Sequence, residues 1–326
     1  MNRTLLFISL FSILTLVSCQ SSPKNEAGKQ NEVELVAEKQ LAFPLDEQTY
    51  YLSKSMFQFE ENGKEYLHFE NTQKSLYDIV IFDIENKQIA KRIPLHKTGP
   101  NGLPAVYGSR PSPDSKQILI SQNNIGRLST INNQGEVVHN YPVKTPEGRF
   151  TTFFFCSYYN APAFVKDSCI FLNQGIFKPN MKREDWPQTH MFASQNLKTG
   201  KFEWVPIFYP PIFKEEYENI DGGYGFSYDY NYKESRLVCG FFGYDSLMVT
   251  DDLKHIRWYN AKSKYLKSMK PKLGNAMAGI NSIIEFCEAP MYWHIMYDKY
   301  RDVYYRFAEM PYKLAPNESP YDEPKG

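Results

Sequence analysis

The sequence lacks an excess of charge of either sign. Its 326 residues include 37 Lys and Arg against 37 Asp and Glu. A chain without net charge has no overall field that attracts nucleic acid or an anionic lipid surface. We therefore predict that no nucleic acid is among its partners.

Catalytic and metal-binding signatures are missing as well. The chain has no Gly-x-Ser-x-Gly elbow, and its six histidines form no His-x-His or His-Glu-x-x-His pair. Lys97-Thr98-Gly99 and Lys198-Thr199-Gly200 match one motif of penicillin-binding enzymes, but the companion Ser-Asp-Asn is absent. We interpret both as turns and predict no catalytic residue and no cofactor.

Long apolar runs are rare, and the clearest is at the N-terminus. Arg3 precedes the mostly apolar stretch Leu5–Val17, which has the length of a signal-peptide core rather than of a membrane span. Leu16-Val17-Ser18-Cys19 then resembles the bacterial lipobox, in which the cysteine is lipidated. We predict a signal peptide over residues 1–18 and a lipid anchor on Cys19, which gives the protein a membrane partner.

The residues after Cys19 are polar and poor in aromatics. Residues 19–34 are therefore expected to form a flexible tether. Gln20 follows the cysteine where an Asp would signal inner-membrane retention in enterobacterial lipoproteins. By that resemblance we predict an outer-membrane location, with the periplasmic and surface orientations both open.

Cysteine is scarce in the rest of the chain. The four that remain are Cys156, Cys169, Cys239 and Cys287. Their spacings match no zinc pattern, although an exported protein could form disulfides. We interpret them as small buried residues.

Aromatic residues, by contrast, are abundant. The chain has 24 Tyr and 23 Phe, a composition that favours strands. Turn-like clusters rich in Asn, Asp, Gly, Ser and Lys separate short apolar strands. One family of turns contains Gly63, Ser115, Ser168, Ser235 and Asp302. Each of these residues precedes a similar strand: 66–69, 118–120, 169–172, 237–240 and 303–307.

A second family of turns falls between the members of the first. Its members are Asp83–Lys87, Asn132–Gly135, Asn196–Gly200 and Asp251–Lys254. Each repeat therefore contains four antiparallel strands, which is the pattern of a β-propeller blade. We predict an all-β propeller over residues 35–326 with about five blades.

Two short motifs carry a resemblance to known propellers. Ser112-Pro113-Asp114-Ser115-Lys116 is similar to the hairpin of WD40-like and TolB-like repeats. Gly99-Pro100-Asn101-Gly102 is similar to the blade-entry loop of six-bladed propeller lipoproteins of Bacteroidota. Together with the lipobox, the chain resembles a lipoprotein family of unknown function in that group. The resemblance implies a fold and an anchor but no activity.

The last repeat is incomplete. It has predicted strands at Ser282–Phe286 and Val303–Phe307, with an extra strand at Tyr292–Met296, before a proline-rich tail. The resemblance implies a sixth blade closed by an N-terminal strand near Glu34–Pro44. We therefore expect a propeller that is shortened at its C-terminus.

Long loops on one face of the propeller are the expected binding surface. They are residues 96–108, 175–191, 206–224 and 260–279. Their candidate ligand-binding residues are Arg183, Asp185, Trp186, Tyr209, Tyr217, Asp221 and Tyr224. We predict a binding module for a glycan, a peptide or an envelope protein.

One enzymatic alternative stays open. Some propellers bind calcium in the central channel and hydrolyse esters or lactones there. The predicted innermost strands offer oxygen ligands at Glu60, Asn160, Asp229, Asn281 and Glu285.

Overall fold

The computed structural model describes residues 40–50, 53, 55–71, 77–112, 114–122, 126–143, 154–155, 161–174, 187–210, 226–266 and 290–310. The chain divides into an N-terminal unit, residues 1–41, and a second unit, residues 42–326, which contains the strands. No helix among the described residues is long and apolar enough to cross a membrane. The predicted signal peptide, Cys19 and the tether lie outside the described residues.

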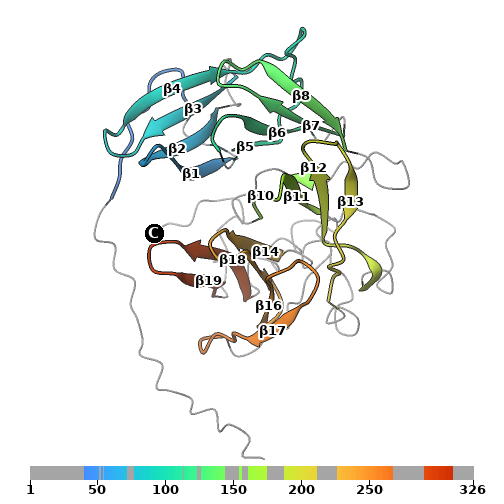
Figure 1. Cartoon of the computed structure of the whole chain (residues 1–326). Coiled ribbons are helices and arrows are strands. Elements are labelled where there is room, and N and C mark those ends of the chain that lie inside the picture. The colour runs from blue at the N-terminus through green and yellow to red at the C-terminus, as the bar shows by residue number, and fades with distance from the viewer. Residues whose placement is uncertain are drawn as a thin grey trace, which may run out of the picture. The chain divides into compact units, whose positions relative to one another are not determined.

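The strands form five antiparallel sheets (Figure 1). The first contains β1 (Met56–Glu61), β2 (Lys64–Asn71), β3 (Asp78–Asp83) and β4 (Gln88–Pro94). The second contains β5 (Gly108–Pro111), β6 (Ile118–Gln122), β7 (Arg127–Ile131) and β8 (Val137–Pro142). The third contains β10 (Phe164–Lys166), β11 (Cys169–Gln174), β12 (Phe192–Asn196) and β13 (Phe202–Trp204), with β9 (Phe154–Phe155) paired to β11.

The last two sheets differ in size. The fourth contains β14 (Phe226–Asn231), β15 (Arg236–Phe241), β16 (Ser246–Thr250) and β17 (Arg257–Asn260). The fifth contains β18 (Met291–Asp298) and β19 (Val303–Glu309). The fold is therefore the predicted all-β propeller, with four four-stranded blades and a partial fifth sheet among the described residues.

The turns between the strands explain why the sequence repeat was visible. Gly63, Ser115, Ser168, Ser235 and Asp302 all have positive φ, between 54° and 75°. The second family of turns has positive φ at Lys87, Gly135, Gly200 and Leu253. Small, polar and glycine residues reach this left-handed region most easily, so the turn composition marks the hairpins directly.

The fifth sheet corrects one detail of the prediction. Ser282–Phe286, predicted as its first strand, lies outside the described residues. The strand that pairs with β19 is β18, which the sequence had suggested only as an extra strand. The amide of Asp302 donates to the Asp298 carbonyl at 2.9 Å and closes a direct hairpin between them.

Apolar clusters join each sheet to the next. Ile79 and Ile93 pack with Ile118 and Ile131 between the first and second sheets. Between the second and third sheets, the cluster contains Leu119, Leu128, Tyr141, Ile170 and Ala193. Between the fourth and fifth it contains Val238, Val249 and Ile295.

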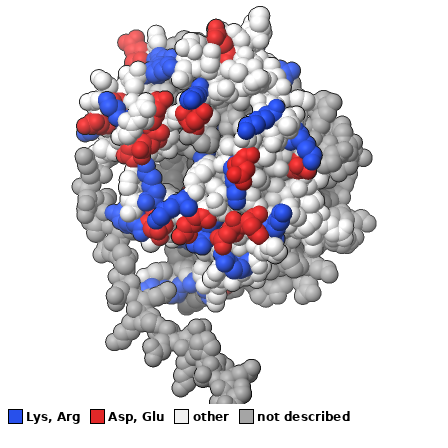
Figure 2. Space-filling view, viewed as in Figure 1, with Lys and Arg blue, Asp and Glu red and all other residues white. Residues whose placement is uncertain are grey.

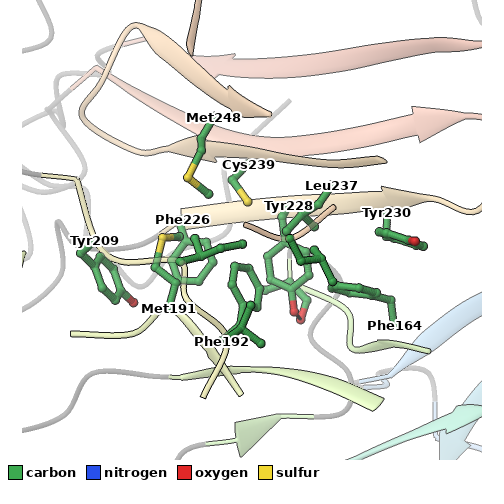
Figure 3. Packing of buried hydrophobic residues seen from close by; sticks show 14 of the residues in the cluster. Phe164, Met191, Phe192, Tyr209, Phe226, Tyr228, Tyr230, Leu237, Cys239 and Met248 are labelled. Carbon is green, nitrogen blue, oxygen red and sulfur yellow. Dashed lines mark hydrogen bonds between the residues drawn. The ribbon is translucent and has the colours of Figure 1, made fainter. Parts of the chain in front are cut away.

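The largest cluster lies between the third and fourth sheets (Figure 3). The ring of Phe192 meets that of Tyr228 edge-on at 5.0 Å, and Phe164 stacks on Tyr230 at 4.3 Å. Cys239 is fully buried here. Burial of each large side chain contributes on the order of 2–3 kcal/mol.

The prediction that the cysteines are buried is confirmed for Cys239, whereas Cys169 is only partly buried. Cys239 and Cys169 are free thiols, and burial raises the pKa of both. Cys156 and Cys287 lie outside the described residues.

Polar contacts, not an apolar cluster, join the fifth sheet to the first among the described residues. The Lys299 ammonium lies 3.1 Å from Glu65 and 3.6 Å from Glu60. Gln58 donates to the Tyr300 hydroxyl at 3.2 Å, and that hydroxyl donates to Glu65. Contacts between neighbouring sheets therefore run through all five and return to the first.

Candidate functional site

Most of the predicted loop residues cannot be placed. Arg183, Asp185, Trp186, Tyr217, Asp221 and Tyr224 lie outside the described residues. Tyr209 is described, and the expectation that it lies on an exposed loop is wrong. Its side chain is 2 % exposed and meets the Phe226 ring edge-on at 5.7 Å. Burial raises its pKa above the ordinary range, and its position indicates a packing role.

The calcium candidates are only partly described. Asn160, Asn281 and Glu285 lie outside the described residues. Glu60 is exposed and faces Lys299, whereas Asp229 is half-buried and accepts hydrogen bonds from the amides of Tyr230 and Tyr297 at 2.8 Å each. Within the described part of the chain, no three His, Cys, Asp or Glu side chains gather in a way that could hold a metal ion.

A polar site lies instead where the first strands of the sheets meet, around Arg110 at the end of β5. The guanidinium carbon of Arg110 lies 5.3 Å from the centroid of the Phe57 ring on β1. Its Nη2 donates to the hydroxyl of Tyr232, just after β14, at a long 3.4 Å. The same hydroxyl accepts the amide of Val165 on β10 at 3.2 Å. Arg110 therefore touches the first and fourth sheets directly and the third through Tyr232.

The guanidinium of Arg110 is incompletely satisfied. Its Nη1 is buried and has no hydrogen-bond partner among the described residues. Several other arginines of the described chain pair with carboxylates, among them Arg92 with Asp78 and Arg301 with Asp298, each within 2.8 Å. A buried cation without a paired anion is costly, and such a group in a native protein calls for an explanation.

Ser109, the residue before Arg110, connects β5 to the first sheet. Its hydroxyl donates to the Glu70 carboxylate at 3.0 Å, and the His68 Nε2 lies 2.8 Å from the Ser109 hydroxyl oxygen. Because Ser109 has a single hydroxyl proton and gives it to Glu70, His68 must donate through Nε2. The bare Nδ1 of His68 is then buried without a partner.

His68 is neutral in this environment. Its side chain is fully buried, and burial together with the nearby charge of Arg110 lowers its pKa from 6.5 to about 3. The sequence contained no motif for this network, because Ser109 and Glu70 are far apart along the chain and meet only through the pairing of two blades.

Asp229 adds a carboxyl group to the same region. Burial raises its pKa, while the amides of Tyr297 and Tyr230 and the charge of Arg110 act in the opposite direction. Its bond to the Tyr297 amide brings the fifth sheet to the site. The site thus combines one incompletely satisfied cation with a neutral histidine and a half-buried carboxyl.

The charged surface of the face shown in Figure 2 is mixed. Figure 2 shows Lys and Arg interspersed with Asp and Glu, around a hollow near the centre of the face. This pattern agrees with the balanced composition. Because this face has no field of one sign, selection of a ligand depends on individual groups.

Comparison with known proteins gives a fold and a family. A crystal structure of a DUF4221 family member from Bacteroides vulgatus ATCC 8482 is similar at 84% identity with a TM-score of 0.84. The match covers 91% of this chain and 82% of that one. A Bacteroides fragilis protein named "Putative exported protein" is similar at 10% identity with a TM-score of 0.49, over 82% of this chain and 74% of its own.

Among curated proteins the chain has no match. The family described as "Domain of unknown function (DUF4221)" matches residues 32–324, nearly the whole length predicted to form the propeller. The chain therefore belongs to the DUF4221 family.

Proposed function

We propose that this protein is a lipid-anchored, ligand-binding propeller of the bacterial cell envelope. The observation that carries the binding function is Arg110, a cation at the meeting point of the blades whose Nη1 has no partner in the described part of the chain. Rigid scaffolds commonly place recognition groups where several elements converge. The ligand is a glycan, a peptide or a segment of an envelope protein.

The anchor is supported by the sequence alone. The signal-like residues 1–18 and Cys19 would place the propeller on a membrane, with the outer membrane favoured by Gln20. Growth of cells with labelled palmitate should label the full-length protein and not a Cys19→Ala variant. Membrane fractionation of the wild type then locates the anchor. An unlabelled wild-type protein would contradict the lipid anchor without touching the binding function.

Binding is tested with the mature protein in detergent. A panel of neutral and acidic oligosaccharides and of short peptides is measured by isothermal titration calorimetry. Saturable binding of at least one panel member supports the binding function, and absence of binding across the panel contradicts it. Calcium content after dialysis addresses the hydrolase alternative, because a calcium enzyme retains a tightly held ion.

A further inference from the structure

We propose that Arg110 is the receptor for a carboxylate group of the ligand, an inference that rests on the proposed binding function. An arginine presents a planar fork of donors that matches a carboxylate through two parallel hydrogen bonds. In the described structure the guanidinium is held in place but forms no such pair of hydrogen bonds. Its one hydrogen bond to protein is the long contact to the Tyr232 hydroxyl.

The surroundings hold the guanidinium in place. The guanidinium carbon lies 5.3 Å from the centroid of the Phe57 ring, and Nη2 contacts the hydroxyl of Tyr232, which follows β14 of the fourth sheet. A cation fixed by stacking loses little further freedom when an anion binds, so the site is preorganised. The side chain of Arg110 is partly exposed even though its Nη1 is buried, which gives an incoming group access to one side.

The charges favour a carboxylate over a doubly charged phosphate. Among the described residues of this site Arg110 is the one arginine or lysine, and the half-buried Asp229 is close enough for its pKa to respond to that charge. A second full negative charge would meet Asp229 without a further cation to balance it. A single carboxylate adds only one negative charge to the site, which already holds Asp229 and Glu70 beside the one positive charge of Arg110.

Two sources could supply this group: an acidic sugar or the C-terminus of a peptide. The probes are trigalacturonate with its methyl ester, trialanine with its C-terminal amide, and inorganic phosphate. Each is titrated into the mature wild-type protein, Arg110→Met and Arg110→Lys. Arg257→Met is the matched control, because Arg257 is an exposed arginine paired with Asp251.

We expect one of the two carboxylate probes to bind the wild type at least tenfold more tightly than its neutral partner and than phosphate. Arg110→Met should abolish this preference, Arg110→Lys should retain part of it, and Arg257→Met should keep it. The preferred probe identifies the source as sugar or peptide. Without ligand, Arg110→Met should unfold at the same or a higher temperature than the wild type, since it removes a cation whose buried Nη1 has no partner among the described residues.

Two results would overturn the inference. In the first, a probe and its neutral partner bind equally, and Arg110→Met binds as the wild type does. This result supports the binding function and contradicts the role of Arg110 as carboxylate receptor. If no carboxylate probe binds, the inference also falls, and the neutral members of the broader panel decide the binding function separately. A clear loss of thermal stability in Arg110→Met would instead assign Arg110 a structural role.

Discussion

The guanidinium carbon of Arg306 on β19 lies 3.3 Å from the ring centroid of Tyr292 on β18. The same guanidinium donates to the carbonyl oxygens of Phe241, Tyr244, Asp245 and Ala261 in and around the fourth sheet. The Tyr292 hydroxyl donates to the Asp245 carboxylate at 2.8 Å. Arg306 and Tyr292 together attach the two-stranded fifth sheet to the fourth.

Arg306→Met should therefore destabilise the protein strongly. Burial already lowers the pKa of Arg306 to about 10, so the environment tolerates this charge only because several carbonyls surround it. Loss of the guanidinium removes one donor from each of these carbonyls, of which those of Phe241 and Asp245 keep a backbone donor, and should reduce the free energy of unfolding by about 3 kcal/mol. Urea denaturation measures the change. In the control Arg301→Met, the lost side chain is 71% exposed, and the change should be below about 1 kcal/mol. Equal losses in the two variants would refute the attachment role.

The junction between the fifth and first sheets should respond to salt. Lys299→Glu would set a third carboxylate beside Glu60 and Glu65 and lower the melting temperature at low ionic strength. The loss of unfolding free energy should be small, about 1 kcal/mol, and should decrease at about 0.5 M salt because these groups are exposed. Adding Glu65→Lys should restore part of the loss. A salt-independent change, or no rescue, would show that the ion pairs do not hold this junction.

The hairpins could be predicted from sequence because their chemistry is local. Ser115 and Asp302 mark turns that need positive φ, and the turn composition reveals this without knowledge of the fold. The strand that begins at Met291 was misassigned because several apolar segments before the Asp298–Asp302 turn look alike. Tyr209 was misplaced for a related reason: whether a tyrosine beside prolines packs inward depends on Phe226, a residue of the next blade.

The candidate site could not be predicted in the same way. Ser109 and Arg110 precede a recognised hairpin motif, but their partners His68, Glu70, Phe57 and Tyr232 come from other blades. On the predicted first strands the sequence suggested only oxygen ligands for calcium, which include Asp229 but not Arg110. Only the pairing of the sheets shows that Arg110 lacks a carboxylate within ion-pair distance among the described residues.

His68 should make the protein sensitive to mild acid. Its pKa falls from 6.5 to about 3 in the folded protein, so the unfolded state binds the extra proton between these values. The free energy of unfolding should therefore decrease as pH falls below 6.5, by about 1.4 kcal/mol per pH unit for this group. His68→Gln should remove this slope. Asp229 has a raised pKa and acts in the opposite direction, but it is present in both proteins and cancels in the difference. Parallel curves of unfolding free energy for the wild type and His68→Gln between pH 7 and about 4.5 would contradict the lowered pKa of His68.

Gly135 should tolerate alanine much less well than Gly63. Both have positive φ, +83° and +75°, so alanine strains the backbone at each position by about 1 kcal/mol. At Gly63 an added Cβ meets nothing within 4 Å, whereas at Gly135 it would lie 1.9 Å from the carbonyl oxygen of Pro94. Pro94 ends β4 and Gly135 lies in the turn before β8, so this collision pushes the first and second sheets apart.

We expect Gly63→Ala to cost about 1 kcal/mol of unfolding free energy and Gly135→Ala about 3 kcal/mol. Urea denaturation of the two variants beside the wild type gives the comparison, with the common backbone strain cancelling in the difference. The excess at Gly135 then measures how closely neighbouring blades must approach at this turn. Equal losses would mean that the first and second sheets can separate there without cost. Backbone conformation alone would then explain why position 135 requires glycine.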